Sequence, residues 1–225
     1  MQFIGRFMTD PNSRIHSDVA SYYSQRLQEH GATARGVDWK DHEGQFLRFA
    51  ELSRIVLETY RPGQAFSITD FGCGYGAFLE YMQQRFPAEC EFEFLGLDLA
   101  DNMVTTHSAG TLFGEPRARF LQGHEPDIIT DFAVASGIFN VCLDTNHEKW
   151  LNYILETLDI MARHSRRGFA FNCLTSYSDE DHKADHLYYA DPCFLFDYCN
   201  RKFSRNVALL HDYNLYEFTL LVRLS

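Results

Sequence analysis

Residues 70–76 read Asp-Phe-Gly-Cys-Gly-Tyr-Gly, and this stretch decides the fold. The residues before it, 65–70, are strand-like, and the residues from Ala77 onward have the spacing of a helix, so the glycines lie in a strand-to-helix turn. Glycine allows a tight backbone turn and lets a ligand approach without a clash with a Cβ atom. The start of a helix adds free N–H donors and the positive end of the helix dipole. The sequence therefore predicts a site for an anionic or polar, nucleotide-like group.

Short apolar segments alternate with helical ones along the chain that follows. Strands are predicted at 65–70, 92–97, 119–122, 131–136 and 168–174, and helices at 78–86, 102–109 and 147–163. This alternation predicts right-handed crossovers between parallel strands, with helices on both faces of the sheet. The last two strands, 206–212 and 218–224, are separated only by residues 213–217, and so short a connection joins antiparallel strands. We therefore expect an α/β fold with a seven-stranded, mostly parallel sheet that ends in an antiparallel hairpin.

The first 64 residues are polar and rich in helix formers. Apolar side chains recur at helical spacing within 18–29 and 43–60, and the run Arg-Pro-Gly at 61–63 breaks the second helix. Because no other part of the chain is available to shield a ligand at the sheet edge from water, we expect residues 1–64 to form a helical cap over that edge. Residues 65–225 then form the core, and the chain folds as a single unit.

Composition and charge exclude several classes of protein. Hydrophobic residues make up 45% of the 225 residues and charged residues 23%, which is the balance of a globular chain. The formal net charge of −11 repels a phosphate backbone, so nucleic acid is not expected as a partner. No segment approaches the ~18 consecutive apolar residues of a membrane span, and residues 1–13 lack the apolar core of a signal peptide. With six cysteines, no C-x-x-C pair and no signal peptide, we expect free thiols, no metal site and a cytoplasmic protein. We also expect no membrane partner and either a monomer or a homodimer.

Two kinds of nucleotide cofactor fit the glycine turn. The pattern Gly72-x-Gly74-x-x-Ala77 obeys the dinucleotide-binding rule, which makes an NAD-dependent oxidoreductase one interpretation. Asp98, at the end of the next strand, can accept hydrogen bonds from both ribose hydroxyls, but this device does not discriminate between cofactors. Asp70 argues against a dinucleotide, because a carboxylate two residues before the first glycine repels a pyrophosphate and attracts a cationic amino group.

The run D-x-G-x-G-x-G at 70–76 resembles motif I of the class I S-adenosylmethionine-dependent methyltransferases. Residues 96–103 are similar to the second motif of that family, and the antiparallel end of the sheet also fits it. The resemblance covers residues 65–225, and residues 36–39 and 213–219 are similar to a group of small bacterial methyltransferases. It implies a Rossmann-like methyltransferase fold and an enzyme that transfers a methyl group from S-adenosylmethionine to an oxygen or nitrogen nucleophile of a small molecule, releasing S-adenosylhomocysteine. The alternatives are the NAD-dependent oxidoreductase and a non-catalytic protein that binds S-adenosylmethionine.

The resemblance also implies which residues hold the cofactor. The acid at the end of the second strand binds the ribose, the residues after it pack on the adenosine, and the turn after the third strand contacts the adenine edge. The family often places an acid in that turn, whereas this sequence has Gln122-Gly123-His124. The fourth strand ends at the lip where sulfonium and acceptor meet. The implied cofactor-binding residues of the core are Asp70, Gly72, Cys73, Gly74, Gly76, Asp98, Leu99, Met103, Gln122, Gly123, His124, Ser136 and Gly137.

Two residues of the cap are expected at the same site. Arg48 offers a guanidinium that matches the methionine carboxylate in a bidentate pair. Trp39 is expected to line the pocket of the sulfonium or of the acceptor. The alternatives are that Arg48 faces solvent and that Trp39 only packs.

The acceptor side of the site carries no conspicuous catalytic motif. Methyl transfer from a sulfonium is an in-line displacement, for which a protein supplies mainly alignment, a dry cavity and removal of the acceptor's proton. The candidate catalytic residues are Asn140 at the end of the fourth strand and the histidines His147 and His211, because imidazole is the side chain most often used as a general base. Residues 175–200 form an insertion rich in aromatic side chains, which predicts either a lid that recognises the acceptor or a helix over 192–202 that packs on the sheet.

Overall fold

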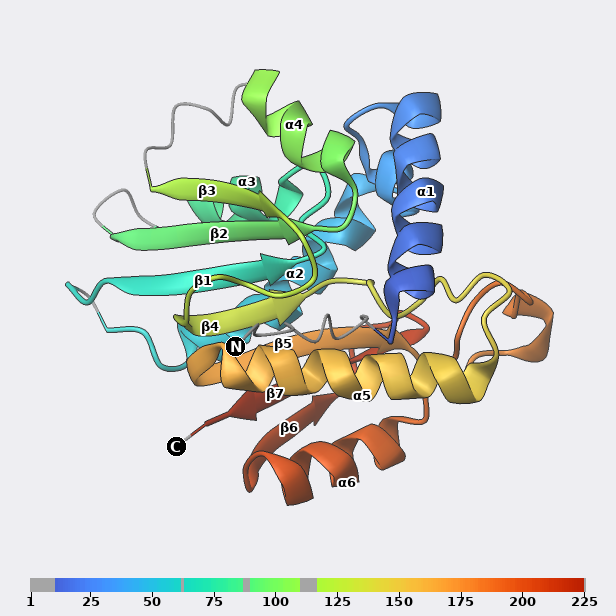
Figure 1. Cartoon of the computed structure of the whole chain (residues 1–225). Helices are drawn as coiled ribbons and strands as arrows, with labels where there is room; N and C mark the ends of the chain where they lie inside the picture. Colours follow the sequence, from blue (N-terminus) through green and yellow to red (C-terminus); the bar gives the residue numbers. More distant parts are fainter. Residues whose placement is uncertain (1–10, 62, 87–89, 110–116, 225) are drawn as a thin grey trace, which may run out of the picture.

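The computed structural model describes residues 11–61, 63–86, 90–109 and 117–224. In this part of the chain, seven strands form one sheet in the order β3-β2-β1-β4-β5-β7-β6 (Figure 1). The strands are β1 (Phe66–Phe71), β2 (Phe92–Asp98), β3 (Ala118–Gln122), β4 (Thr130–Ala135), β5 (Ser165–Leu174), β6 (Asn206–Leu210) and β7 (Glu217–Arg223). β7 pairs antiparallel with both β5 and β6, and all other neighbours are parallel. The predicted α/β fold, with its mostly parallel sheet and antiparallel end, is confirmed.

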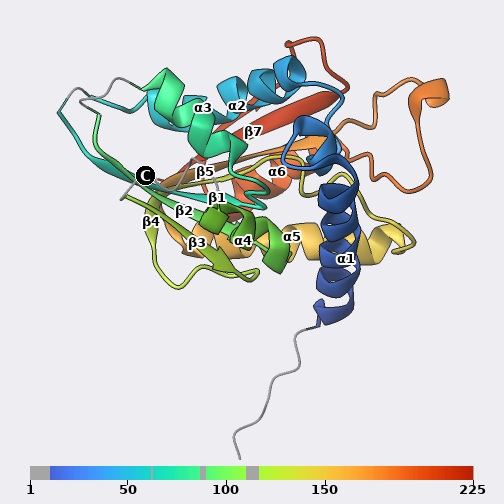
Figure 2. The ribbon, with the colours of Figure 1, turned by 90° about the horizontal axis from the view of Figure 1, so that it is seen from above.

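Helices lie on both faces of this sheet. They are α1 (Ser13–His30), α2 (His42–Leu57), α3 (Ala77–Arg85), α4 (Asp101–Ala109), α5 (His147–Arg163) and α6 (Pro192–Lys202). α2 and α3 cover one face, and α5 and α6 cover the other (Figure 2). Successive side chains of a strand point to opposite faces, so Phe132 and Val134 of β4 pack with α2 and α3 while Ala133 and Ala135 pack with α5. None of the described helices has the length and apolar character needed to cross a membrane.

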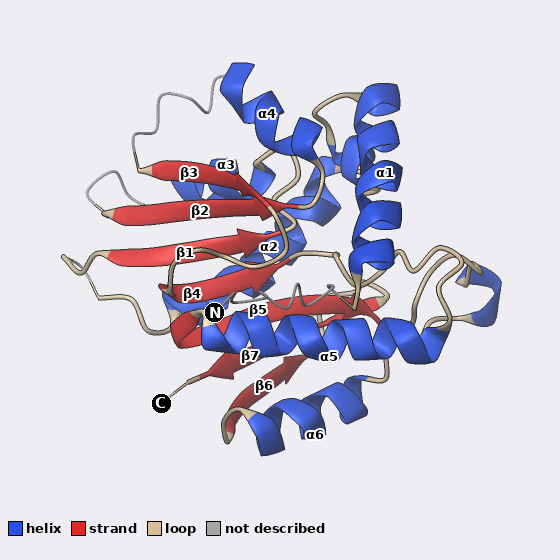
Figure 3. Cartoon of the chain, in the orientation of Figure 1, coloured by secondary structure: helices blue, strands red, loops and turns tan. Residues whose placement is uncertain are grey.

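α1 stands across the edge of the sheet at which the parallel strands end (Figure 3). Two hydrogen bonds tie it to elements on either side: Ser24 Oγ donates to Asn102 Oδ1 of α4 at 2.9 Å, and Asn12 Nδ2 donates to Glu156 Oε2 of α5 at 2.6 Å. Parallel sheets bind ligands at this edge. α1 therefore takes the place that we expected for the cap.

Most of α2 does not cover that edge, in contrast to the expectation for the segment 43–60, and only Gln45 and Phe49 near its start reach the candidate site. It packs on the face of the sheet against β4, β5 and β7. Phe49, Leu52 and Ile55 are each at most 3% exposed in this position, because their helical spacing forms a continuous apolar stripe that the flat face of a sheet can bury. Among the described residues before 65, the edge is covered mainly by α1 and by the short 3-10 turn Ala34–Val37 that follows it.

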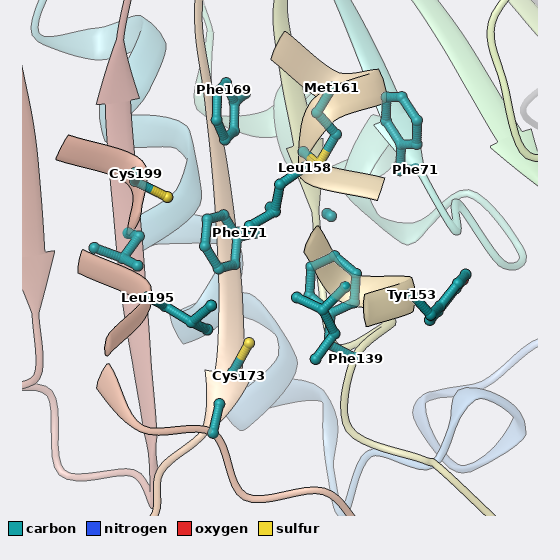
Figure 4. Packing of buried hydrophobic residues seen from close by; sticks show 14 of the residues in the cluster. Phe71, Phe139, Tyr153, Leu158, Met161, Phe169, Phe171, Cys173, Leu195 and Cys199 are labelled. Atoms are coloured by element: carbon teal, nitrogen blue, oxygen red, sulfur yellow. The ribbon is translucent and has the colours of Figure 1, made fainter. Parts of the chain in front are cut away.

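The core between the sheet and α5 and α6 is rich in aromatic side chains (Figure 4). Phe169 and Phe171 of β5 meet Leu158 and Met161 of α5, and all four are fully buried. Burial of each such side chain stabilises the fold by ~1.5–3 kcal/mol. This packing fixes the positions at which β4 and β5 end, and these ends bound the candidate site.

The helix predicted over 192–202 is present as α6, but its aromatic side chains do not all pack on the sheet, since Phe194 is 44% exposed and Phe196 and Tyr198 are half-buried. The interpretation as a lid that recognises the acceptor stays a prediction. Asp191 caps α6 by accepting hydrogen bonds from the backbone N–H groups of Cys193 and Phe194, and Leu195 and Cys199 are buried against the sheet. The preceding segment, 175–191, is an irregular loop that projects beyond the same edge as α1 (Figure 1).

Candidate active site

The glycine turn joins β1 to α3, as the sequence predicts. Gly72, Gly74 and Gly76 have φ angles of +69°, +53° and +85°, which disfavour side chains with a Cβ atom. The backbone N–H groups of Gly72 and Cys73 donate to the carbonyl of Leu97 at 2.7 and 3.0 Å, so the turn is anchored to β2. A Cβ atom on Gly72 would lie 2.2 Å from Cγ2 of Ile138, so the space beside the turn also requires glycine.

Asp98 holds the turn from the neighbouring strand. Its Oδ2 accepts from the N–H of Gly74 and its Oδ1 accepts from the N–H of Ala100, both at 2.9 Å. Burial raises the pKa of the Asp98 carboxyl, and these backbone hydrogen bonds partly offset the rise. Each carboxylate oxygen has a second lone pair, so Asp98 can still accept hydrogen bonds from a diol.

A cavity of about 310 Å³ opens beside the turn and Asp98. The expected cofactor residues in its wall are Gly72, Gly74, Asp98, Leu99, Met103, Gly123 and His124. α1 adds Val19 and Tyr23 to the wall, and α5 adds Tyr153 and Ile160. Gln122 is not in the wall; its Nε2 donates to the carbonyl of Leu99 at 3.3 Å.

His124 has a partner in this cavity that the sequence did not reveal. The imidazole of His16 in α1 stacks on that of His124 with 4.5 Å between ring centroids, and Tyr153 meets His16 edge-on at 5.7 Å. His16 and Tyr23 line the cavity but lie outside the motifs, whereas Ile138 follows the fourth strand, whose end was expected at the site. His16 and Tyr23 come to the site because α1 lies across the edge of the sheet, and no local pattern in the sequence encodes that.

A second cavity, of about 30 Å³, adjoins the first at the turn. Its wall is formed by Val37, Trp39, Gln45, Phe49, Asp70, Gly72, Cys73, Gly74, Tyr75, Ala77, Phe78 and Ser136, and three of these (Val37, Gly72 and Gly74) also line the large cavity. Tyr75 Oη donates to Gln45 Oε1 at 2.8 Å, which ties the turn to α2. Burial holds the pKa of the Cys73 thiol well above its ordinary value, so this thiol stays neutral and unreactive.

Asp70 and Ser136 are the polar groups of the small cavity that lack partners. Asp70 is 2% exposed, and none of the described residues donates a hydrogen bond or forms an ion pair to its carboxylate. Burial, with a smaller contribution from the charge of Asp98, raises the pKa of the Asp70 carboxyl well above its ordinary value. The hydroxyl of Ser136 is buried without a partner among the described residues. A buried carboxylate beside an unpaired hydroxyl fits a ligand that brings a cation and hydrogen-bonding groups.

Arg48 has a different partner from the one we expected. Its Nε and Nη2 donate to the two carboxylate oxygens of Glu217 at 2.8 and 2.7 Å, and its Nη1 donates to the carbonyl of Gly44 at 2.7 Å. All three nitrogens are thus engaged within the protein, and Arg48 is absent from the walls of both cavities. The expected bidentate pair exists, but with Glu217 in place of a methionine carboxylate. Trp39 does line the small cavity, and the guanidinium of Arg48 lies 4.0 Å above its ring.

Comparison with known proteins identifies the family. No family model matches the chain. The Mycobacterium tuberculosis (strain ATCC 25618 / H37Rv) protein named "Putative methyltransferase Rv1506c" is 51% identical over 158 residues, which cover 70% of this chain and 93% of that protein. The chain belongs to the methyltransferases.

Solved structures agree with the fold of this methyltransferase. Magnesium protoporphyrin IX methyltransferase (ChlM) from Synechocystis PCC 6803 with bound S-adenosylhomocysteine superimposes with a TM-score of 0.64, covering 95% of this chain and all of that one at 11% identity. The plantazolicin methyltransferase BpumL gives 0.57 at 12% identity over 94% and 98% of the two chains. A methyltransferase from Aquifex aeolicus described as SAM-dependent gives 0.53 at 14% identity over 83% and 100%. At these identities the likeness concerns the fold, which is the predicted Rossmann-like methyltransferase fold.

The three candidate catalytic residues of the methyltransferase lie outside the walls of both cavities. Asn140 is buried and its Oδ1 accepts from the N–H of Leu174 at 3.0 Å, which joins the ends of β4 and β5. His147 begins α5 and meets Tyr188 edge-on at 5.4 Å. His211 is exposed after β6, with its ring 6.1 Å from that of Tyr177. The structure does not bring these residues together.

One group of side chains in the projecting loop has the composition of a metal site. Asp179, Asp181 and His182 each offer a ligand atom within 4.8 Å of the others, and all three are exposed. Asp179 accepts a hydrogen bond from Tyr216 Oη. Exposed acids of this kind are ordinarily solvated, and we assign no metal to them.

Proposed function

We propose that this methyltransferase transfers the methyl group of S-adenosylmethionine to a small-molecule acceptor and releases S-adenosylhomocysteine. The observation that carries the proposal is the pair of carboxylates, Asp98 in the large cavity and Asp70 in the small one, placed on either side of a single glycine turn. A dinucleotide would bring the negative charge of a pyrophosphate to the same turn, where Asp70 repels it, whereas Asp98 can bind the ribose of either cofactor. S-adenosylmethionine instead carries a ribose, a sulfonium and an ammonium group, to which acids are complementary.

The two cavities suit the two ends of this cofactor. We assign the adenosine to the large cavity, where Asp98 accepts from the ribose hydroxyls, Leu99 and Met103 pack on the base, and Gly123 and His124 face its edge. These are the residues that the sequence implied, apart from Gln122, which points elsewhere.

The methionine end then lies at the small cavity. Asp70 binds the ammonium group, which relieves the cost of burying that carboxylate alone. Ser136 supplies a buried hydroxyl as a further hydrogen-bonding group. Because Arg48 is held by Glu217, we assign the methionine carboxylate to the first turn of α3, whose N-cap is Gly76 and whose residue Ala77 lines the cavity. α3 has no side-chain cap, so its first N–H groups are available to an anion.

The bound cofactor supplies an activated methyl group and its own leaving group. The chain aligns the reactants and excludes water: α1 covers the edge of the sheet, and Trp39 bounds the small cavity. For an oxygen or nitrogen nucleophile, a basic group must also take up the proton of the acceptor. His147 and His211 are the candidates for this base, and Asn140, at the joined ends of β4 and β5, is the candidate for orienting the acceptor.

The acceptor that we propose is a small molecule. The net charge of −11 disfavours a nucleic acid. α1, hydrogen-bonded to α4 and next to α5, bounds a cavity of about 310 Å³ beside the turn, which is the size of a small-molecule site. Two of the structural neighbours are named for compounds that they methylate, magnesium protoporphyrin IX and plantazolicin, which is in keeping with a fold that accepts varied small acceptors.

Cofactor binding tests the proposal directly. A ligand at one hundred times its Kd stabilises a protein by ~2.7 kcal/mol, so S-adenosylhomocysteine at saturation is expected to raise the Tm by several degrees, whereas NADH at the same concentration leaves it unchanged. Transfer of a radiolabelled methyl group from S-adenosylmethionine to a fraction of small metabolites then separates an enzyme from a non-catalytic binding protein. A shift with NADH alone would refute the proposal.

A further inference from the structure

A buried ion pair joins two distant parts of the chain behind the small cavity. Arg48 of α2 and Glu217 of β7 are 169 residues apart, and their side chains are 12% and 1% exposed. Both carboxylate oxygens of Glu217 accept from the guanidinium in a bidentate arrangement at 2.7–2.8 Å. This geometry fixes the plane of the guanidinium as well as its position.

The face of that guanidinium supports Trp39. The centre of the guanidinium is 4.0 Å from the centroid of the indole, which is a close cation–π contact. The indole in turn lies directly against Gly137, since a Cβ atom on Gly137 would be 2.3 Å from Cζ2 of Trp39. Trp39 also lines the small cavity, so its contact with the guanidinium links Arg48 to that cavity.

Glu217 reaches the same contact from the other side. Its Oε2 accepts from Nδ2 of Asn172 at 2.8 Å, and Oδ1 of Asn172 accepts from the N–H of Gly137 at 2.7 Å. One buried carboxylate thus sets both Trp39, through Arg48, and Gly137, through Asn172. These two residues touch beside the unpaired hydroxyl of Ser136, the neighbour of Gly137 in the chain.

An ion pair of this kind is a poor source of stability. Desolvation of both charges offsets their attraction, and an apolar pair of the same size commonly serves a core as well or better. α2 already buries Phe49, Leu52 and Ile55 in the same interface with the sheet. The stability of the fold therefore does not explain why this pair is charged. Its contacts do, because Arg48 packs on Trp39 while Glu217 reaches Gly137 through Asn172.

We propose that Arg48 and Glu217 are positioning residues that hold Trp39 against Gly137, and that they thereby set the affinity of the small cavity for the methionine end of the cofactor. The inference rests on the proposed function and extends it to residues that touch neither the cofactor nor the reacting atoms. Trp39 is the residue through which they act.

The test uses a double variant of the full chain, Arg48→Met/Glu217→Gln. It removes both charges together, so no buried charge is left unpaired, and the glutamine carbonyl still accepts from Asn172. We expect the double variant to keep a Tm within a few degrees of the wild type but to bind S-adenosylhomocysteine about tenfold more weakly by calorimetry, with kcat/KM for the cofactor reduced in proportion. Arg54→Met is the matched control on the same helix, because Arg54 is 40% exposed and pairs only with Glu51 and Glu58.

Tryptophan fluorescence reports the positioning itself. The chain has two tryptophans, and Trp150 is fully buried, so quenching by acrylamide monitors Trp39. Quenching should increase in the double variant and stay unchanged in Arg54→Met. Arg48→Lys keeps the charge of the pair and serves if the double variant does not fold. It loses the bidentate fork, so affinity and quenching are expected to change in the same direction by a smaller factor.

The outcomes separate the inference from the proposed function. If the wild type does not bind S-adenosylhomocysteine, the proposed function fails and the inference with it. If the wild type binds and the double variant binds equally well with unchanged quenching, the pair has no positioning role and only the inference fails. A double variant, or Arg48→Lys, with weaker binding, greater quenching of Trp39 and an unshifted Tm supports it.

Discussion

Replacement of Asp70 by asparagine isolates the charge that distinguishes the two cofactors considered for the glycine turn. Asn has nearly the shape of Asp, so the 2% exposed site is neither emptied nor overfilled. What disappears is the charge-assisted hydrogen bond to an ammonium group. Such bonds contribute ~1.5–3 kcal/mol, and ~1.4 kcal/mol corresponds to a factor of ten, so the Kd of S-adenosylhomocysteine is expected to rise roughly 10- to 150-fold.

The same variant changes the pH dependence of binding. In the free protein, burial and the charge of Asp98 raise the pKa of Asp70, so this carboxyl takes up a proton at higher pH than an ordinary carboxyl does. An ammonium ligand binds the ionised form and expels that proton. Wild-type affinity should therefore increase as pH rises through the raised pKa and level off above it, and Asp70→Asn should flatten this dependence.

The stability of the free protein depends on pH in the opposite direction from the affinity. The pKa of Asp70 is higher in the folded than in the unfolded state, so the folded state holds the proton more tightly and the contribution of this group to stability falls as pH rises between the two values. Urea unfolding of the free protein from pH 4 to pH 8 should show this decline in the wild type and a smaller one in Asp70→Asn.

Calorimetry between pH 5 and pH 8 measures the affinities, and proton release is read from the dependence of the binding enthalpy on the buffer. Asp131→Asn is the control, since Asp131 lies on β4, accepts from Ser67 and is absent from both cavity walls. A Kd for Asp70→Asn within twofold of the wild type at every pH would refute the assignment of the ammonium group to Asp70.

Two further substitutions test the turn. Asp98→Asn retains one oxygen acceptor in place of two, so we expect a loss of ~1–3 kcal/mol in urea unfolding and a Kd for S-adenosylhomocysteine raised at least tenfold; equal stability and affinity would contradict the role given to Asp98. Gly72→Ala combines the strain of a φ near +69° with a clash against Ile138. We expect it to lower the free energy of unfolding by ~2–4 kcal/mol and to abolish cofactor binding. Gly31→Ala has a similar φ of +67° but open space around it; its ψ of −169° makes the backbone unfavourable for alanine, so it should cost ~1–3 kcal/mol in stability and leave binding intact. Equal effects of the two glycine substitutions on binding would argue against the clash.

Local patterns in the sequence were sufficient to predict the strands of the sheet and the glycine turn. The helix predicted over 147–163 has the bounds of α5, because Asn146 caps its first turn by accepting from the N–H of Glu148 and an apolar stripe runs its whole length. The glycine turn was predictable because its positive φ angles restrict the residue type at each position. Signals of this kind lie within a few residues of the structure that they specify.

What could not be predicted depends on contacts between distant segments. The apolar stripe of α2 shows that one side of the helix is buried but not which surface buries it. We therefore assigned too much of residues 1–64 to the cap. Arg48 was recognised as a residue that forms a bidentate pair, yet its partner Glu217 lies 169 residues away and has no local pattern to distinguish it. His16 reaches His124 for the same reason, through the path of α1 over the sheet.

The order of the last strands has a consequence for when the protein can bind its cofactor. β7 follows β6 in the chain but lies between β5 and β6, so β6 has no place in the sheet until β7 has entered it. Because β7 also brings Glu217, the event that closes the sheet is the event that gives Arg48 its partner. Such long-range closure is slow compared with the formation of a helix or a hairpin. We therefore expect full affinity for the cofactor only in a chain whose β7 is paired with β5, because Arg48 has its partner only then.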